Sequence, residues 1–344
     1  MSTAVYHRTP DYGFSQGLDY TSQSFPDGAV APHHVSREQL LALPNVGDDP
    51  ERDAQVAEQM KSERIALGMG RAVGYVLFGP KDADKITFAG FGWGGNIAHP
   101  VAIGEAQALA ASDSETQWLM INTPGVGGTE ALPSAIAKEL RQTGSYNSLG
   151  EHYVTAIADE LKGREVHLRG HSLGGRTALG MTPHIEGGVE SLAINDPTGS
   201  KPISLGALAH RFIATEGGHQ AEYKKAGFDP FAAERQKMRA PRGSGDGWAN
   251  LKQMFTIDPI ALTRESFARD LQNALPNVHN ELRVLSPELS ALNNPSDIAE
   301  ILGRVTSSTA SDAFVEQWVL KGHTHSFMSV APAVEALLYK SRSI

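Results

Sequence analysis

Short apolar runs recur along the chain from about residue 71 to its end, separated by glycine-containing turns and by stretches with helical spacing. Seven of these runs have the length and composition of buried strands: 72–78, 86–92, 117–122, 165–169, 191–195, 281–285 and 316–320. The helical patterns between the middle runs lie at 105–111, 131–143, 151–161 and 176–181. Strands that alternate with helices predict crossover connections, so we expect an α/β fold with a mostly parallel, doubly wound sheet.

The first 70 residues lack this alternation. Residues 1–32 are polar and predict a loosely structured arm, while 36–43 and 49–67 carry helical patterning with polar or acidic starts. We expect these segments to lie outside the main sheet.

A second departure lies between 197 and 279, where helical patterns such as 231–238 and 259–275 occur without a clear strand. This interval predicts a helical cap inserted into the sheet domain. The expected order is an arm with helices, the first part of the sheet domain, the cap, and the second part of the sheet domain, at 1–70, 71–196, 197–279 and 280–344.

Composition narrows the function classes. The 344 residues include 30 Lys and Arg against 39 Asp and Glu, a formal charge of -9, which opposes binding to nucleic acid. Cysteine is absent, which excludes a disulfide, a thiolate nucleophile and a cysteine-ligated metal. No apolar run approaches ~18 residues and no secretory signal pattern opens the sequence, so we expect no membrane span and a cytoplasmic location.

The strongest chemical motif is Gly-His-Ser-Leu-Gly-Gly at 170–175, placed directly after a predicted strand and before a predicted helix. In a nucleophile elbow the serine occupies a strained turn, and small residues two positions before and after it let strand and helix approach closely. Gly170 and Gly174 meet that requirement around Ser172. The N-terminus of the following helix favours developing negative charge.

With this motif, the chain from about residue 71 to its end resembles the α/β-hydrolase superfamily. The segment 91–96, Phe-Gly-Trp-Gly-Gly-Asn, looks like the family's oxyanion turn, with Phe91 in place of its histidine. The segment 122–129, Asn-Thr-Pro-Gly-Val-Gly-Gly-Thr, is similar to its Asp-x-Pro-Gly-x-Gly-x-Ser loop, with Asn122 in place of the aspartate. The resemblance implies Ser172 as nucleophile and an oxyanion hole formed by the N–H groups of Trp93 and Leu173.

Serine needs a neighbouring base, and histidine has a suitable pKa. The family's chain order places that histidine after the last strand, where this sequence has His323 and His325. The segment 325–332 looks like the family's histidine loop running into its final helix, which favours His325. A metal at this His-x-His pair is not expected, because no third ligand stands at suitable spacing nearby.

The acid that orients the histidine has two candidates. The segment 287–295 looks like the family loop that usually carries it, yet Ser290 stands where the aspartate is expected. Asp196, at the end of an earlier strand, occupies a position that some relatives use, and Glu288 is the alternative. We favour Asp196.

The resemblance predicts a serine hydrolase that cleaves a small-molecule carboxylic ester, lactone or thioester without a cofactor. An acyltransferase or a lyase on the same scaffold, or a non-catalytic binding protein that retains the fold, are the alternatives. Aromatic residues of the predicted cap either line an apolar acyl pocket or form the cap's own core: Phe212, Tyr223, Phe228, Phe231, Trp248 and Phe255.

Overall fold

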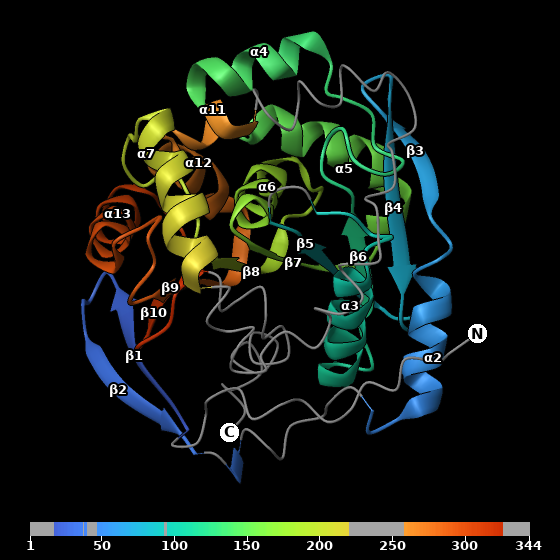
Figure 1. Ribbon diagram of the computed structural model, residues 1–344, viewed down its shortest axis with the longest axis horizontal. Helices are drawn as coiled ribbons and strands as arrows, with labels where there is room; N and C mark the ends of the chain where they lie inside the picture. The colour runs from blue at the N-terminus through green and yellow to red at the C-terminus, as the bar shows by residue number, and fades with distance from the viewer. Residues whose placement is uncertain (1–16, 37, 40–46, 93–94, 220–257, 326–344) are drawn as a thin grey trace.

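The computed structural model describes residues 17–36, 38–39, 47–92, 95–219 and 258–325. Within these residues a single sheet runs in the order β2-β1-β10-β9-β8-β7-β5-β6-β4-β3 (Figure 1). The strands are β1 (Leu18–Phe25), β2 (Val30–Val35), β3 (Arg64–Gly68), β4 (Arg71–Phe78), β5 (Lys85–Gly90), β6 (Gln117–Ile121), β7 (Glu165–His171), β8 (Val189–Asn195), β9 (Val278–Pro287) and β10 (Phe314–Leu320).

The sheet is parallel in its centre and antiparallel at both sides. Strands β6, β5, β7, β8, β9 and β10 pair in parallel, whereas β1 pairs antiparallel with both β10 and β2, and β4 with both β3 and β6. This arrangement confirms the expected mostly parallel sheet. The seven strands predicted from the sequence are β4 to β10, each displaced by only a few residues at its ends.

Helices cover both faces of the sheet. They are α2 (Pro50–Gln59), α3 (Pro100–Ser112), α4 (Ser134–Thr143), α5 (Asn147–Leu161), α6 (Leu173–Met181), α7 (Leu205–His210), α11 (Asp258–Leu262), α12 (Phe267–Ala274) and α13 (Pro295–Ser308). Shorter helical segments are η2 (Thr182–His184), the π-helix η3 (Arg211–Glu216) and η5 (Leu275–Asn277). The helices predicted at 105–111, 131–143, 151–161 and 176–181 correspond to α3, α4, α5 and α6.

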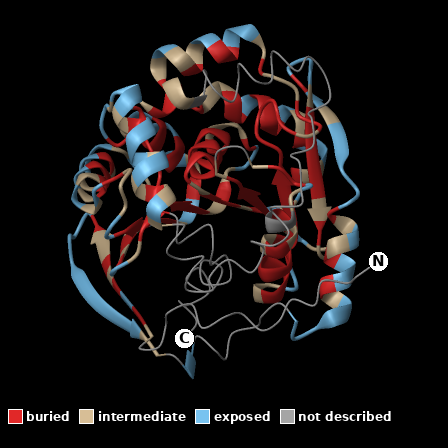
Figure 2. Ribbon diagram, viewed as in Figure 1, coloured by how far each residue is buried: buried red, intermediate tan, exposed pale blue. Residues whose placement is uncertain are grey.

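Alternate residues of single strands belong to two separate hydrophobic clusters. In β6, Leu119 and Ile121 pack with α4, α5 and α6, whereas Trp118 and Met120 pack with α2 and α3. Because successive side chains of a strand point to opposite faces, each face has its own helix layer. The sheet is therefore doubly wound, as expected. Figure 2 shows the central strands buried between these layers and the edge strands β2 and β3 largely exposed.

The expectation that the first 70 residues lie outside the sheet was wrong. Strands β1 and β2 extend the sheet beyond β10, and β3 forms its opposite edge. The buried positions of β1 alternate, but serine, threonine and glutamine occupy half the strand, so its apolar periodicity is weak. The segment 49–67 contains α2 and then β3, whose pairing with β4 outweighs the helical pattern.

The interval of the predicted cap is described in part. Its first portion contains α7 and η3, and its last portion contains α11 and α12. The predicted helix 231–238 lies outside the described residues. Helix α12 contacts α6 and α13, and its Phe267 and Leu271 are fully buried, so this helix belongs to the layer that covers the sheet. In the described part of the chain, no helix combines the length and apolar character required for crossing a bilayer.

Candidate active site

The turn between β7 and α6 places Ser172 in a strained conformation. Its φ of 55° and ψ of -116° are disfavoured for a residue with a side chain. A Cβ atom at Gly170 would lie 2.3 Å from the carbonyl carbon of Gly174, and one at Gly174 would lie 2.2 Å from that of Gly90. Glycine is thus required where strand, turn and helix meet, and the geometry is that of the predicted elbow.

The elbow is joined directly to the end of the next strand. The Ser172 N–H donates to the Asn195 carbonyl at 2.8 Å, and the following residue, Asp196, donates its N–H to the Leu285 carbonyl at 2.8 Å. Asp196 has a φ of 42°, a second strained position beside the first. The backbone therefore places Ser172 and Asp196 at neighbouring carboxyl ends of parallel strands, where α/β sheets commonly hold their sites.

Asp196 and His325 form a buried pair. The Nδ1 of His325 donates to Oδ2 of Asp196 at 2.7 Å, and the two residues are 4% and 1% exposed. In the neutral imidazole with Nδ1 protonated, Nε2 carries no hydrogen and can accept a proton. The two residues are 129 positions apart in the chain, and the fold brings them together as the sequence reasoning expects.

His171 connects this pair to the elbow. Its ring lies 4.5 Å from the His325 ring, centroid to centroid, and Phe212 of η3 contacts the His325 ring edge-on at 5.8 Å. Burial, together with the charge of the neighbouring His325, lowers the pKa of His171 well below its usual range. A neutral His171 therefore adds no positive charge next to His325 near pH 7. Within the described residues, Ser172 Oγ is buried and has no hydrogen-bond partner.

The alternative acid lies elsewhere. Glu288 is an exposed residue whose carboxylate accepts from Lys321 Nζ at 3.1 Å and from the Gly322 N–H at 2.9 Å. These two contacts lower its pKa. The alternative base, His323, is partly buried, and burial lowers its pKa to about 4. The structure thus brings Asp196 to His325, whereas Glu288 lies directly after β9 and contacts Lys321 and Gly322.

Two further side chains contact the Asp196 carboxylate. Ser290 Oγ donates to Oδ2 at 2.5 Å, and Asn293 Nδ2 donates to Oδ1 at 2.8 Å. Both residues come from the loop after β9, the loop in which the sequence lacks the expected aspartate. Asn293 was missed in the sequence reasoning, although it lies only three residues beyond Ser290.

Of the two predicted oxyanion donors, Leu173 lies within the described residues and Trp93 does not. Leu173 is the first residue of α6, so its N–H belongs to the helical turn that has no intrahelical acceptors. Trp93 lies outside the described residues. Gly92, just before it, approaches the elbow, since a Cβ atom there would lie 4.0 Å from that of Ser172.

The helix after the elbow is anchored by a buried ion pair. Arg176 Nη2 contacts Oδ2 of Asp270 in α12 at 2.6 Å, and its Nη1 donates to the Thr198 carbonyl at 2.6 Å. Asp270 also accepts from Ser145 Oγ at 2.6 Å. Arg176 therefore links α6 to α12 and to the loop that follows Asp196. The sequence offers no motif for this pair.

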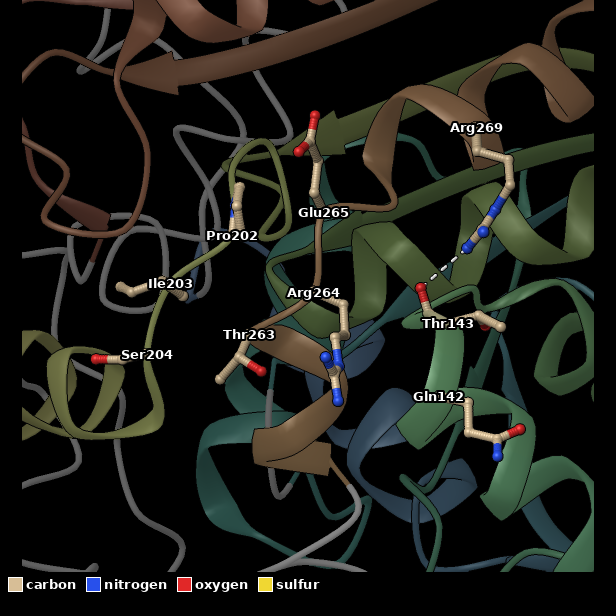
Figure 3. Close-up of a pocket in the computed structure, with 9 residues that line it drawn as sticks. All are labelled: Gln142, Thr143, Pro202, Ile203, Ser204, Thr263, Arg264, Glu265 and Arg269. Atoms are coloured by element: carbon tan, nitrogen blue, oxygen red, sulfur yellow. Dashed lines mark hydrogen bonds between the residues drawn. The ribbon is translucent and has the colours of Figure 1, made fainter.

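A cavity of about 630 Å³ has none of Ser172, Asp196 and His325 in its lining, which consists of Gln142, Thr143, Pro202, Ile203, Ser204, Thr263, Arg264, Glu265 and Arg269 (Figure 3). Arg269 Nη2 donates to the Thr143 carbonyl at 3.0 Å, and Arg264 Nε donates to the Arg141 carbonyl at 3.2 Å. The two arginines thus satisfy carbonyl groups in and beside the last turn of α4, which accounts for their position. Across the described residues, no three His, Asp or Glu side chains gather as a metal site requires.

Comparison with solved structures shows wide similarity at low identity. A bacterial membrane phospholipase A described as a virulence factor matches with a TM-score of 0.51 and 17% identity, over 84% of this chain and 87% of its own. A Bacillus subtilis protein assigned as a hydrolase gives 0.51 and 15%, over 86% and 99%. An esterase of Pyrococcus furiosus gives 0.50 and 13%, over 88% and 94%. No family model and no curated protein sequence matches the chain. The similarity shows a shared fold.

Proposed function

We propose that this chain, which has the α/β-hydrolase fold, is a serine hydrolase that cleaves a carboxylic ester, lactone or thioester through an acyl-enzyme on Ser172. The observation that carries the proposal is the buried His325–Asp196 hydrogen bond next to the strained turn of Ser172. A base with an orienting carboxylate beside a serine on such a turn is the arrangement that activates a hydroxyl.

In the first step, Ser172 Oγ attacks the carbonyl carbon of the substrate while its proton passes to Nε2 of His325. Asp196 keeps the imidazole in the tautomer with Nδ1 protonated and stabilises the imidazolium that forms. The negative charge on the carbonyl oxygen is held by the N–H groups of Leu173 and Trp93. The bond from the acyl carbon to the leaving oxygen, or to the leaving sulfur of a thioester, then breaks, and the leaving group takes the proton from His325.

The acyl-enzyme is resolved by the same groups. His325 takes a proton from water, the resulting hydroxide attacks the acyl carbon, and the proton returns to Ser172 Oγ as the acid leaves. Phe212, packed edge-on against His325, gives one side of the site an apolar surface. We place the acyl group of the substrate against this surface.

The test is hydrolysis of p-nitrophenyl esters of increasing acyl length, with wild type and Ser172→Ala compared, together with labelling by a fluorophosphonate. We expect turnover and labelling in the wild type only, and the length profile measures the acyl pocket. Equal turnover in Ser172→Ala would contradict the proposal. Labelling of Ser172 with transfer of the acyl group to an alcohol, and no hydrolysis, would indicate an acyltransferase. A folded wild type that is neither labelled nor active would indicate a binding protein.

A further inference from the structure

The carboxylate of Asp196 accepts hydrogen bonds from His325 and from two side chains of the loop after β9. His325 Nδ1 and Ser290 Oγ both contact Oδ2, at 2.7 and 2.5 Å, and Asn293 Nδ2 contacts Oδ1 at 2.8 Å. Asp196 is 1% exposed and Asn293 is 6% exposed. A buried carboxylate without donors favours its neutral form, whereas hydrogen bonds to the ionised form favour ionisation.

The direction of both donors is fixed by their own partners. Ser290 Oγ accepts from the N–H groups of Leu292 and Asn293 at 3.1 and 3.3 Å, so its single hydroxyl hydrogen is left for Asp196. Asn293 Oδ1 accepts from Ser200 Oγ at 2.9 Å, which turns its amide nitrogen toward Asp196. The loop is therefore preorganised to donate to the carboxylate, and not to accept from it.

We propose that Ser290 and Asn293 are positioning residues that hold the Asp196 carboxylate in place and aimed at His325. This inference rests on the proposed function, in which Asp196 orients the base. The two donors also help to hold Asp196 in its strained backbone conformation. They fix its side chain from the loop after β9, while the Leu285 carbonyl fixes its N–H. They draw part of the carboxylate's charge away from His325.

The Ser290 hydroxyl and the His325 ring contact the same oxygen atom, Oδ2 of Asp196. Position 290 therefore lies close to His325, and we expect an aspartate there to reach the ring when residue 196 has a shorter side chain. Asn293 contacts the other oxygen, Oδ1, at 2.8 Å and offers a matched control from the same loop. Asp196 and His171 both contact the His325 ring. Substitutions at positions 290 and 293 leave both of these residues in the sequence.

The primary test compares Ser290→Ala with Ser290→Thr, which keeps the hydroxyl. For Ser290→Ala we expect kcat to fall by about 10- to 100-fold with little change in KM, as for loss of a supporting contact to a site residue. Because less of the carboxylate's charge is neutralised, protonation of His325 is favoured and the acid limb of the kcat/KM profile moves to higher pH. Ser290→Thr should restore both kcat and the position of the limb. Equal kcat and an unmoved limb in Ser290→Ala, or equal losses in the two variants, would overturn the proposal.

A second test moves the carboxylate. Asp196→Ser should lose most activity, and Asp196→Ser with Ser290→Asp should regain at least about tenfold in kcat, the effect of restoring an orienting carboxylate to the histidine. Asp196→Ser with Asn293→Asp should regain less, because position 293 faces the oxygen away from His325. Equal recovery in both double variants would show that position 290 has no special relation to the histidine.

One readout separates failure of this inference from failure of the proposed function. The ¹⁵N-histidine spectrum of the full chain, with the His325 signal assigned by His325→Gln, follows protonation of the ring without any substrate. A higher titration midpoint of that signal in Ser290→Ala supports the inference even where no ester is turned over. An unchanged midpoint overturns it, whereas the absence of Ser172-dependent turnover in the wild type contradicts only the proposed function.

Discussion

Asn122 donates a 2.5 Å hydrogen bond from Nδ2 to Oε1 of Glu63, which also accepts from the Gly128 N–H at 2.9 Å. Asn122 Oδ1 accepts from the Ile97 N–H at 2.8 Å. This side chain therefore joins the segment before β3, the turn after β5 and the glycine-rich loop after β6. At this point the Asn122 amide acts as a donor to the carboxylate that Glu63 supplies.

Asn122→Asp should destabilise the protein at pH 7, since it places two carboxylates in contact and removes the N–H that Asn122 donates to Glu63. We expect a loss of about 1–3 kcal/mol in the free energy of unfolding, the usual cost of a buried group left unsatisfied. Urea unfolding of the variant and the wild type at pH 7 measures it. Glu63→Gln in the same chain should restore stability, and a double variant no better than Asn122→Asp would contradict this explanation.

Asp196→Asn and Glu288→Gln should differ sharply in rate. Asp196→Asn supplies a donor where His325 needs an acceptor, so kcat should fall by about 10³- to 10⁴-fold. Glu288→Gln retains an oxygen for the Gly322 N–H and lies away from His325, so kcat should stay within about threefold, as for surface changes that touch no site residue. Steady-state kinetics on the same ester decides, and a large loss in Glu288→Gln alone would make Glu288 the acid.

The central sheet could be predicted from the sequence because its strands are short segments rich in apolar residues, bounded by turns, whose residues are mostly buried. The edge strands could not. β1 contains Asp19, Ser22 and Gln23, and its partner β10 lies about 300 residues away in the chain, so no local pattern indicates the pairing. β3 was missed because Arg64 to Gly68 continues the helical spacing of α2, and only the pairing with β4 makes it a strand.

Ser172 and His325 could be proposed from the sequence because motif and chain order point to them without any distance. Between Asp196 and Glu288 the sequence gives only a preference, and in the structure the carboxylate that contacts His325 is that of Asp196. Asn293 carries no sequence signal of its own. Its role follows from the hydrogen bond to Asp196, which is visible only in the folded chain.

Gly174→Ala should destabilise the fold strongly. The added Cβ would lie 2.2 Å from the backbone of Gly90, and a backbone contact cannot be relieved by a side-chain rotation. We expect a loss of at least about 2 kcal/mol, in the upper part of the range for overpacked sites. Gly206→Ala in α7 is the matched control, because a Cβ atom there has open space around it and alanine favours a helix. Urea midpoints compare the two, and equal stability would refute the packing argument at the elbow.

Stability should fall with acid because of His152. This residue is fully buried, and burial lowers its pKa to about 4 from 6.5 in the unfolded chain. Between these values the unfolded chain binds more protons, so the free energy of unfolding decreases as pH falls through this window and levels off below it. His152 alone should cost about 2 kcal/mol between pH 7 and pH 5. In His152→Leu the fall should be smaller by that amount, and parallel curves for the two proteins would exclude His152 as the cause.

The pairing of β1 with β10 also has a consequence for biosynthesis. β1 is translated before every other strand of the sheet in the described residues, yet its partner β10 is translated after all of them. Until then β1 and β2 form at most an isolated hairpin, which is marginal in water. Of the strand pairings in the described residues, β1 with β10 can therefore form only after all the other strands have been translated, and a nascent chain stalled before residue 314 would keep β10's place in the sheet open to other strands.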